Sequence, residues 1–145
     1  MTIKWTKYIN EHDKQKMNVN MIAIRQDMSH LFEIDEALRS GNIVSFPTDR
    51  SMGDRVITRD FLGAPAEFPM GPFSVAAMRG LDVLAVNVMK TGRVSYTIYV
   101  TELEYDREAG RKEQIDQLSR AYVAELEKCV RQYPTQWYNF YDFWK

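Results

Sequence analysis

The chain has 145 residues, of which 45% are apolar and 27% charged, and its 19 basic and 20 acidic side chains give a formal net charge of -1. This composition predicts a single soluble globular domain, and the lack of a basic surplus argues against nucleic acid as a partner. The longest apolar run that reads as a strand, residues 83–86, is far shorter than the roughly 20 apolar residues of a membrane-spanning helix.

Residues able to bind a metal or act as a nucleophile are few. Cys129 is the only cysteine, which excludes an intrachain disulfide, and we interpret it as a small buried residue on a helix. The two histidines, His12 and His30, are well separated, so we expect no zinc or transition-metal site. The first residues are charged and contain no apolar segment, which favours a cytoplasmic location.

The first half of the chain reads as an arm, a helix and a strand. Residues 1–20 are polar and predict an N-terminal arm, followed by one domain over residues 21–145. Apolar residues recur every three to four positions between Asp27 and Ser40, which predicts an amphipathic helix ended by Gly41. Residues 43–46 predict a short buried strand, and residues 48–55 a polar loop.

The second half alternates between helices and strands. Residues 61–72 contain three prolines and two glycines and are expected to be irregular, whereas residues 72–79 predict a helix ended by Gly80. Residues 83–89 and 94–101 predict a hairpin at one edge of the sheet. A long helix over 111–132 and a short aromatic helix after Pro134 complete an α/β sandwich with a mixed sheet flanked by helices.

His30 and Asp35 have the spacing of a catalytic pair in which histidine deprotonates a hydroxyl and aspartate orients the imidazole. On a continuous helix, residues five apart are rotated by about 500°, so their side chains point about 140° apart. We therefore favour a helix histidine that faces solvent or is satisfied by neighbours, with the catalytic pair as the alternative.

Polar side chains follow the predicted strand at 43–46. Thr48, Asp49, Arg50 and Ser51 bring a carboxylate, a guanidinium and two hydroxyls to the carboxyl end of this strand, where open α/β sheets bind ligands. Arginine is suited to holding a phosphate through two parallel hydrogen bonds. A loop that only makes local salt bridges is an equally good interpretation.

Aromatic residues gather at the C-terminus. Trp137, Phe140, Tyr141 and Trp144 have helical spacing and would share one face of the predicted helix. We favour packing of this face on the domain, and the alternative is an anchor at the depth of lipid headgroups.

Three segments together resemble the bacterial lipid A biosynthesis acyltransferases, the lauroyl and myristoyl transferases within the lysophospholipid acyltransferase superfamily. These segments are Gly-Asn-Ile-Val-Ser-Phe-Pro-Thr-Asp-Arg at 41–50, Phe-Leu-Gly-Ala-Pro-Ala-Glu-Phe-Pro-Met-Gly-Pro-Phe at 61–73, and Tyr-Pro-Thr-Gln-Trp-Tyr at 133–138. The resemblance runs from about Met21 to the C-terminus. It implies the C-terminal half of a glycerolipid acyltransferase-type α/β sandwich.

The resemblance implies transfer of a fatty acyl chain from an acyl carrier protein or coenzyme A thioester to a hydroxyl of a membrane glycolipid. It places this reaction at the inner face of the cytoplasmic membrane, where contact would be peripheral, and implies no metal or redox cofactor. Asp49 and Arg50 match the block that holds the phosphate or polar head of the acceptor, with Thr48 and Ser51 as neighbours. The residues expected to shape the loop beside this site are Gly63, Pro65 and Gly71.

Two departures from the family pattern limit this interpretation. Residues 46–51 are similar to the superfamily's Phe-Pro-Glu-Gly-Thr-Arg-type block, but the Glu-Gly is absent. The family's catalytic His-x4-Asp motif lies well upstream of that block, and we expect it to be missing here, because His30 and Asp35 lie in the helix just before the block. We therefore expect an acceptor-binding part without the general base, which leaves enzymatic activity of this chain open. The rival hypothesis is a non-catalytic membrane-surface or protein-interaction module that uses the aromatic C-terminal segment. A half-fold leaves sheet edges uncovered, which predicts self-association.

Overall fold

The structure is a computed structural model that describes residues 19–25, 27–50 and 55–144. The chain divides into two compact units, residues 1–45 and residues 46–145. The predicted N-terminal arm lies outside the described residues except for its last two positions. Each unit is described separately below.

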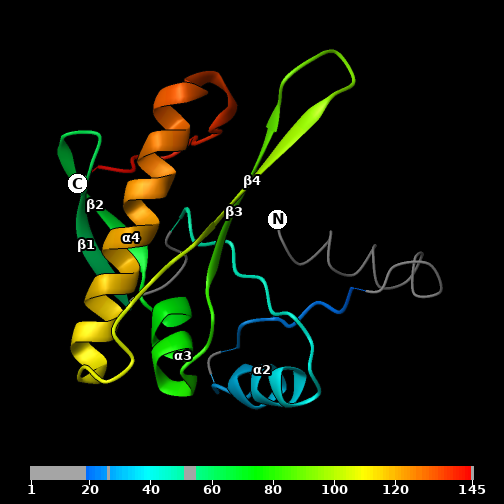
Figure 1. Ribbon diagram of the computed structural model, residues 1–145, viewed down its shortest axis with the longest axis vertical. Helices are drawn as coiled ribbons and strands as arrows, with labels where there is room; N and C mark the ends of the chain where they lie inside the picture. Colours follow the sequence, from blue (N-terminus) through cyan, green and yellow to red (C-terminus); the bar gives the residue numbers. More distant parts are fainter. Residues whose placement is uncertain (1–18, 26, 51–54, 145) are drawn as a thin grey trace. The chain divides into compact units, whose positions relative to one another are not determined.

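The N-terminal unit contains the helix α2 (His30–Arg39), close to the predicted bounds (Figure 1). The carboxylate of Asp27 accepts hydrogen bonds from the backbone N–H and the hydroxyl of Ser29, at 3.0 and 2.8 Å, and so fixes the chain just before the helix. Gly41 follows the helix with a φ of 75°, a left-handed conformation that glycine adopts without strain.

The C-terminal unit contains two hairpins and two helices among its described residues. In chain order these are β1 (Val56–Phe61), β2 (Ala64–Pro69), α3 (Gly71–Arg79), β3 (Leu84–Lys90), β4 (Tyr96–Glu102) and α4 (Arg111–Gln132), and a 3-10 turn at Pro134–Gln136 follows (Figure 1). The predicted helices α3 and α4 and the predicted β3–β4 hairpin are confirmed.

The predicted mixed sheet is wrong. Among the described residues the strands form two separate antiparallel pairs, β1–β2 and β3–β4. Residues 43–46 form no strand in the described part of the chain, and Ile43 is 98% exposed. An extended segment becomes a strand only when a neighbouring strand pairs with its N–H and C=O groups, and the apolar pattern of these residues does not supply one.

The prediction of an irregular segment over residues 61–72 is also wrong, because β2 and the end of β1 lie within it. Leu62 and Gly63 both have positive φ values, 56° and 92°, as a tight hairpin turn requires. Pro65 and Pro69 are accommodated because β1 is the one partner strand of β2 among the described residues, and the other side of β2 meets the chain only at a single bridge between Ala66 and Trp144.

The core of this unit lies on both sides of α4. Leu126 and Val130 of α4 pack with Phe61 and Phe68 of the first hairpin. About two helical turns closer to the N-terminus of α4, Leu118 packs with Phe73 and Ala76 of α3, with Ala85 of β3, and with Leu103 just after β4. The helix therefore holds both hairpins.

The predicted aromatic helix at the C-terminus is wrong. Only Pro134–Gln136 is helical, and the segment beyond runs back along the first hairpin. Trp144 pairs with Ala66, and its indole N–H donates to the carbonyl of Phe61 at 3.0 Å. The ring of Phe61 also meets that of Trp137 edge-on, with ring centroids 5.2 Å apart. These contacts with a buried phenylalanine replace the helical face that the spacing suggested.

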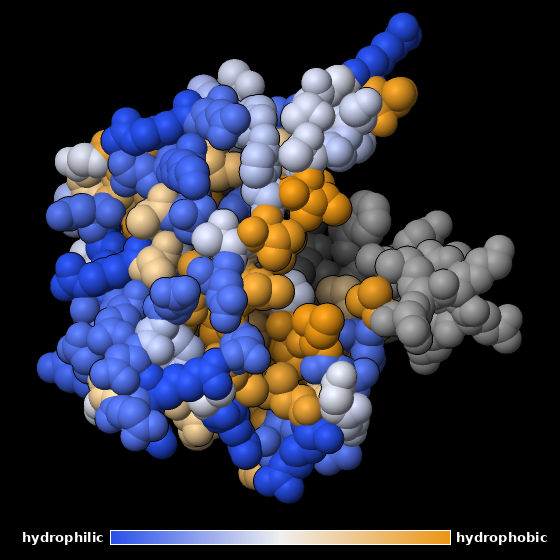
Figure 2. Space-filling model, in the orientation of Figure 1, coloured by the Kyte–Doolittle hydropathy of each residue, from blue (hydrophilic) through white to orange (hydrophobic). Residues whose placement is uncertain are grey.

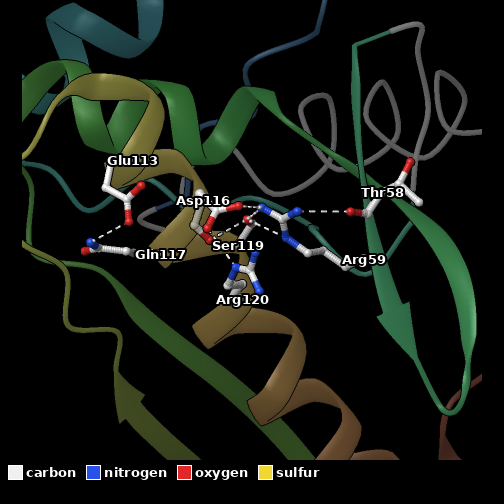
Figure 3. A network of polar contacts seen from close by, with 7 residues as sticks. All are labelled: Thr58, Arg59, Glu113, Asp116, Gln117, Ser119 and Arg120. Carbon is white, nitrogen blue, oxygen red and sulfur yellow. Dashed lines mark hydrogen bonds and ion pairs between the residues drawn. The ribbon is translucent and has the colours of Figure 1, made fainter.

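A polar network ties β1 to α4 (Figure 3). The guanidinium of Arg59 donates to the Asp116 carboxylate at 2.6 Å and to the Ser119 hydroxyl at 2.7 and 3.0 Å. Arg120 donates to the same carboxylate at 2.7 Å from the solvent side. The Arg59 side chain is 16% exposed and that of Arg120 is 69% exposed. The two arginines share one partner but differ in burial.

We predict that Arg59→Met destabilises the unit more than Arg120→Met does. Loss of Arg59 removes largely buried hydrogen bonds to a charged group, which typically costs about 1.5–3 kcal/mol, whereas exposed ion pairs contribute little. The free energy of unfolding from urea titration measures both effects. Equal losses for the two variants would show that the network does not fasten the hairpin.

Candidate functional site

The predicted site residues Thr48, Asp49 and Arg50 lie at the start of the C-terminal unit, and Ser51 lies outside the described residues. Thr48 is buried, at 8% exposure, and its hydroxyl donates to the carbonyl of Phe46 at 3.2 Å. This bond folds the chain back over two residues. Thr48 therefore anchors the segment and turns Asp49 and Arg50 toward the surface.

Asp49 and Arg50 form a two-pronged ion pair. The Arg50 Nε and Nη2 atoms donate to the two Asp49 carboxylate oxygens at 3.3 and 2.9 Å. These bonds, together with the charge of Asp49, raise the pKa of Arg50 above its ordinary value. They use two of the five N–H donors of the guanidinium. The Arg50 side chain is 47% exposed, so its charge remains accessible from solvent.

Two tyrosines that the sequence analysis did not assign to a site lie within electrostatic range of this pair. Burial is the main cause that raises the pKa of Tyr122, and the charge of Asp49 raises it further while that of Arg50 lowers it. The pKa of Tyr141 is raised by burial as well, with the charges of Arg50 and Asp49 acting in opposite directions. Both phenols therefore stay protonated at neutral pH.

Tyr122 is held by aromatic packing from two elements. Its ring lies edge-on to Phe68 of β2, with centroids 6.3 Å apart, and tilted against Phe73 of α3 at 5.8 Å. It packs against the core clusters on both sides of α4. Tyr122 lies more than 70 residues from Asp49 and Arg50 in the chain, so only the fold relates it to them.

The three residues expected to shape the site belong to the first hairpin and the helix after it. Gly63 lies in the β1–β2 turn, and Gly71 begins α3. Pro65 of β2 pairs with Asp60 of β1. Gly71 precedes Phe73, which contacts Tyr122, by two residues. Their role in shaping the site remains a prediction.

His30 and Asp35 lie on α2 in the N-terminal unit, and each has a partner of its own. The His30 Nδ1 atom accepts a hydrogen bond from the backbone N–H of Arg25 at 3.2 Å. Asp35 forms an ion pair with Arg39 at 3.0 Å. These contacts agree with a helix histidine satisfied by a neighbour.

The C-terminal aromatic residues serve different purposes. Trp137 and Trp144 pack on Phe61, and Phe143 between them in sequence is buried. In contrast, Phe140 is 91% exposed and stacks on Tyr138, which is 66% exposed. The four residues proposed as one helical face therefore do not form a common surface.

No cluster of three or more histidine, cysteine or acidic side chains suited to a metal ion occurs within residues 19–25, 27–50 and 55–144. In the same part of the chain, no helix has the length and apolar character needed to cross a membrane.

Comparison with known proteins identifies the family. The family model described as bacterial lipid A biosynthesis acyltransferase matches residues 6–145. No curated protein and no solved structure matches the chain significantly. The matched range contains the three segments whose glycines, prolines and aromatic residues suggested the resemblance, together with Asp49 and Arg50. The chain therefore belongs to the bacterial lipid A biosynthesis acyltransferase family.

Proposed function

We propose that this chain supplies the acceptor-binding part of an acyltransferase that esterifies a hydroxyl of a membrane glycolipid, with an acyl carrier protein or coenzyme A thioester as donor. Membership of the family supports the reaction class. The observation that carries the binding role is the half-exposed Arg50, held from one side by Asp49. The proposal places the chain at the inner face of the cytoplasmic membrane.

The arrangement around Arg50 suits an anionic head group. Asp49 occupies one edge of the guanidinium and thereby restricts its rotation, which lowers the entropy lost when a ligand binds. A phosphate can then accept hydrogen bonds from the remaining N–H groups. The protonated hydroxyls of Tyr122 and Tyr141 add neutral donors near the same charge. These residues bind and orient the acceptor, and we assign none of them a proton transfer.

We predict that Arg50→Ala weakens binding to vesicles that contain an anionic lipid A precursor by about 10-fold or more, the equivalent of one or two hydrogen bonds between charged groups. Arg50→Lys should recover only part of this loss, because an ammonium group lacks the planar fork. Vesicle cosedimentation across a range of lipid concentrations measures the affinities.

Arg93→Ala is the matched control, because Arg93 is an exposed arginine in the β3–β4 turn and its loss changes the net charge equally. It should change the affinity little. If both alanine variants lose the same affinity, binding reflects general charge attraction and Arg50 is not part of a site. Thermal unfolding of each variant, expected to match the wild type, confirms that the fold is retained.

The second candidate function is a non-catalytic module that binds a membrane surface through its C-terminal segment. It is favoured by the exposed ring pair of Tyr138 and Phe140, which projects from a segment fixed to the core by Trp137 and Phe143. Aromatic side chains of this kind are enriched where proteins meet lipid headgroups.

For this second function we predict that Phe140→Ser reduces binding to uncharged phosphatidylcholine vesicles by about 10-fold, because burial of a phenylalanine contributes about 1.5–3 kcal/mol. Phe32→Ser is the matched control, since Phe32 of α2 is 80% exposed. Tryptophan fluorescence on addition of vesicles measures the affinity. Equal affinities for the wild type and Phe140→Ser would contradict a role of the C-terminal rings in membrane binding.

A further inference from the structure

One face of the β3–β4 hairpin is apolar and exposed along its whole length. Exposure alternates along β3 and, apart from Tyr99, along β4, as expected when side chains point alternately to opposite faces. Six apolar residues on this face are each more than half exposed, namely Leu84, Val86, Val88, Tyr96, Ile98 and Val100. Figure 2 shows hydrophobic side chains along the course of this hairpin.

The opposite face of the hairpin is fixed to α4 and the segment after it. Ala85 is buried beside Leu118 in the core, and Thr101 donates from its hydroxyl to Glu125 at 3.2 Å. Nearer the hairpin turn, the hydroxyls of Tyr99 and Tyr133 are 2.6 Å apart and share a hydrogen bond. Because these contacts set the orientation of both strands, the exposed face is presented as a defined surface.

The charges on this surface lie at its two ends. The register pairs Lys90 with Tyr96 at one end and Leu84 with Glu102 at the other. The two rows between them are wholly apolar, because Val88 pairs with Ile98 and Val86 with Val100. Six residue steps separate the end rows, a distance of about 20 Å in an antiparallel strand. We call these eight residues the hairpin face.

We propose that the hairpin face binds the same face of a second copy of this chain, with the two hairpins stacked face to face and related by a two-fold axis. Such an axis, passing between the two apolar rows, sets the Val86 row of one copy against the Val88 row of the other. It also sets the Lys90–Tyr96 row of each copy against the Leu84–Glu102 row of the other, so that Lys90 and Glu102 lie diagonally across each end of the interface. One surface is then its own complement, as a two-fold interface requires.

Charge complementarity selects this occupant. A pairing of the two copies with strands in the same direction would oppose lysine to lysine and glutamate to glutamate, so the charges favour only the antiparallel arrangement. The nearby Arg107 forms its ion pair with Asp82 and not with Glu102. A lipid surface would cover the apolar rows but offers no group in register with a lysine and a glutamate about 20 Å apart.

The size of the surface limits the affinity. A standard interface uses about 20–30 residues from each partner, and the hairpin face has eight. We therefore expect a dimer with a dissociation constant in the micromolar range. This proposal is independent of the acceptor site, because no residue of the hairpin face is among Thr48, Asp49, Arg50, Tyr122 or Tyr141.

The first test compares Val88→Lys with Val94→Lys by sedimentation velocity across a protein concentration series. Val88 lies in a central row of the hairpin face, whereas Val94 is 87% exposed in the link between the strands and outside the face. The proposal expects a concentration-dependent dimer for the wild type and Val94→Lys, and loss of at least 10-fold in dimer affinity for Val88→Lys. A wild type that stays monomeric at several hundred micromolar overturns it, and so does an equal loss in both variants.

The second test uses charge reversal at the ends of the face and does not depend on the apolar core of the interface. Lys90→Glu and Glu102→Lys should each weaken the dimer, because like charges then face each other. An equimolar mixture of the two variants should associate again, as each interface end regains one lysine and one glutamate. If the mixture stays as weak as its components, the antiparallel arrangement is wrong.

Hydrogen exchange gives a further readout of the interface. Exchange in β3 and β4 that does not change with protein concentration overturns the proposal, because the cross-strand hydrogen bonds alone already protect these amides. Faster exchange on dilution of the dimer would support it.

Discussion

A hairpin of two strands is marginally stable in water, so each of the two small sheets in this protein depends on what its buried face packs against. For both, that element is α4. Phe61 and Phe68 of the first hairpin pack on Leu126 of α4, and Ala85 of the second packs near Leu118. Because the two contacts occupy different turns and sides of one helix, α4 determines how the hairpins are placed relative to each other.

This dependence extends to the candidate site. Tyr122 packs against both core clusters, and its ring contacts Phe68 of the first hairpin and Phe73 of α3. Its hydroxyl end lies within electrostatic range of Asp49 and Arg50. The first hairpin and α3 therefore both set the position of this ring, and the Arg59 network fastens β1 of that hairpin to α4.

Local sequence signals predicted those elements whose causes are themselves local. The bounds of α3 and α4 follow from apolar spacing, from Gly80 and from Pro134, and the β3–β4 hairpin from its two β-rich runs. Elements that depend on a distant partner were predicted wrongly. Prolines in β2 are tolerated because that strand has one partner strand and only a single bridge, to Trp144, on its other side. Residues 43–46 lack the partner that would make them a strand.

The same distinction explains what the sequence revealed of the site. Asp49 and Arg50 are adjacent in the chain, so their pairing was visible as a pattern. Tyr122 and Tyr141 lie within electrostatic range of this pair but more than 70 residues away in the chain. No local pattern in the sequence predicts that proximity. At the C-terminus, helical spacing was misleading because the packing of Trp137 and Trp144 against the buried ring of Phe61 outweighs the helical preference of a short segment.

The exposed apolar surfaces of the C-terminal unit differ in kind, and this difference assigns them different partners. Tyr138 and Phe140 form a small pair flanked by polar Asn139 and neighbouring Asp142, which suits shallow insertion among headgroups. The hairpin face is instead a flat strip of rigidly held side chains, with opposite charges at a fixed separation. A fluid bilayer cannot match charges in register, whereas a second folded surface can. The hairpin face therefore suits a protein partner even in a chain of the lipid A biosynthesis acyltransferase family.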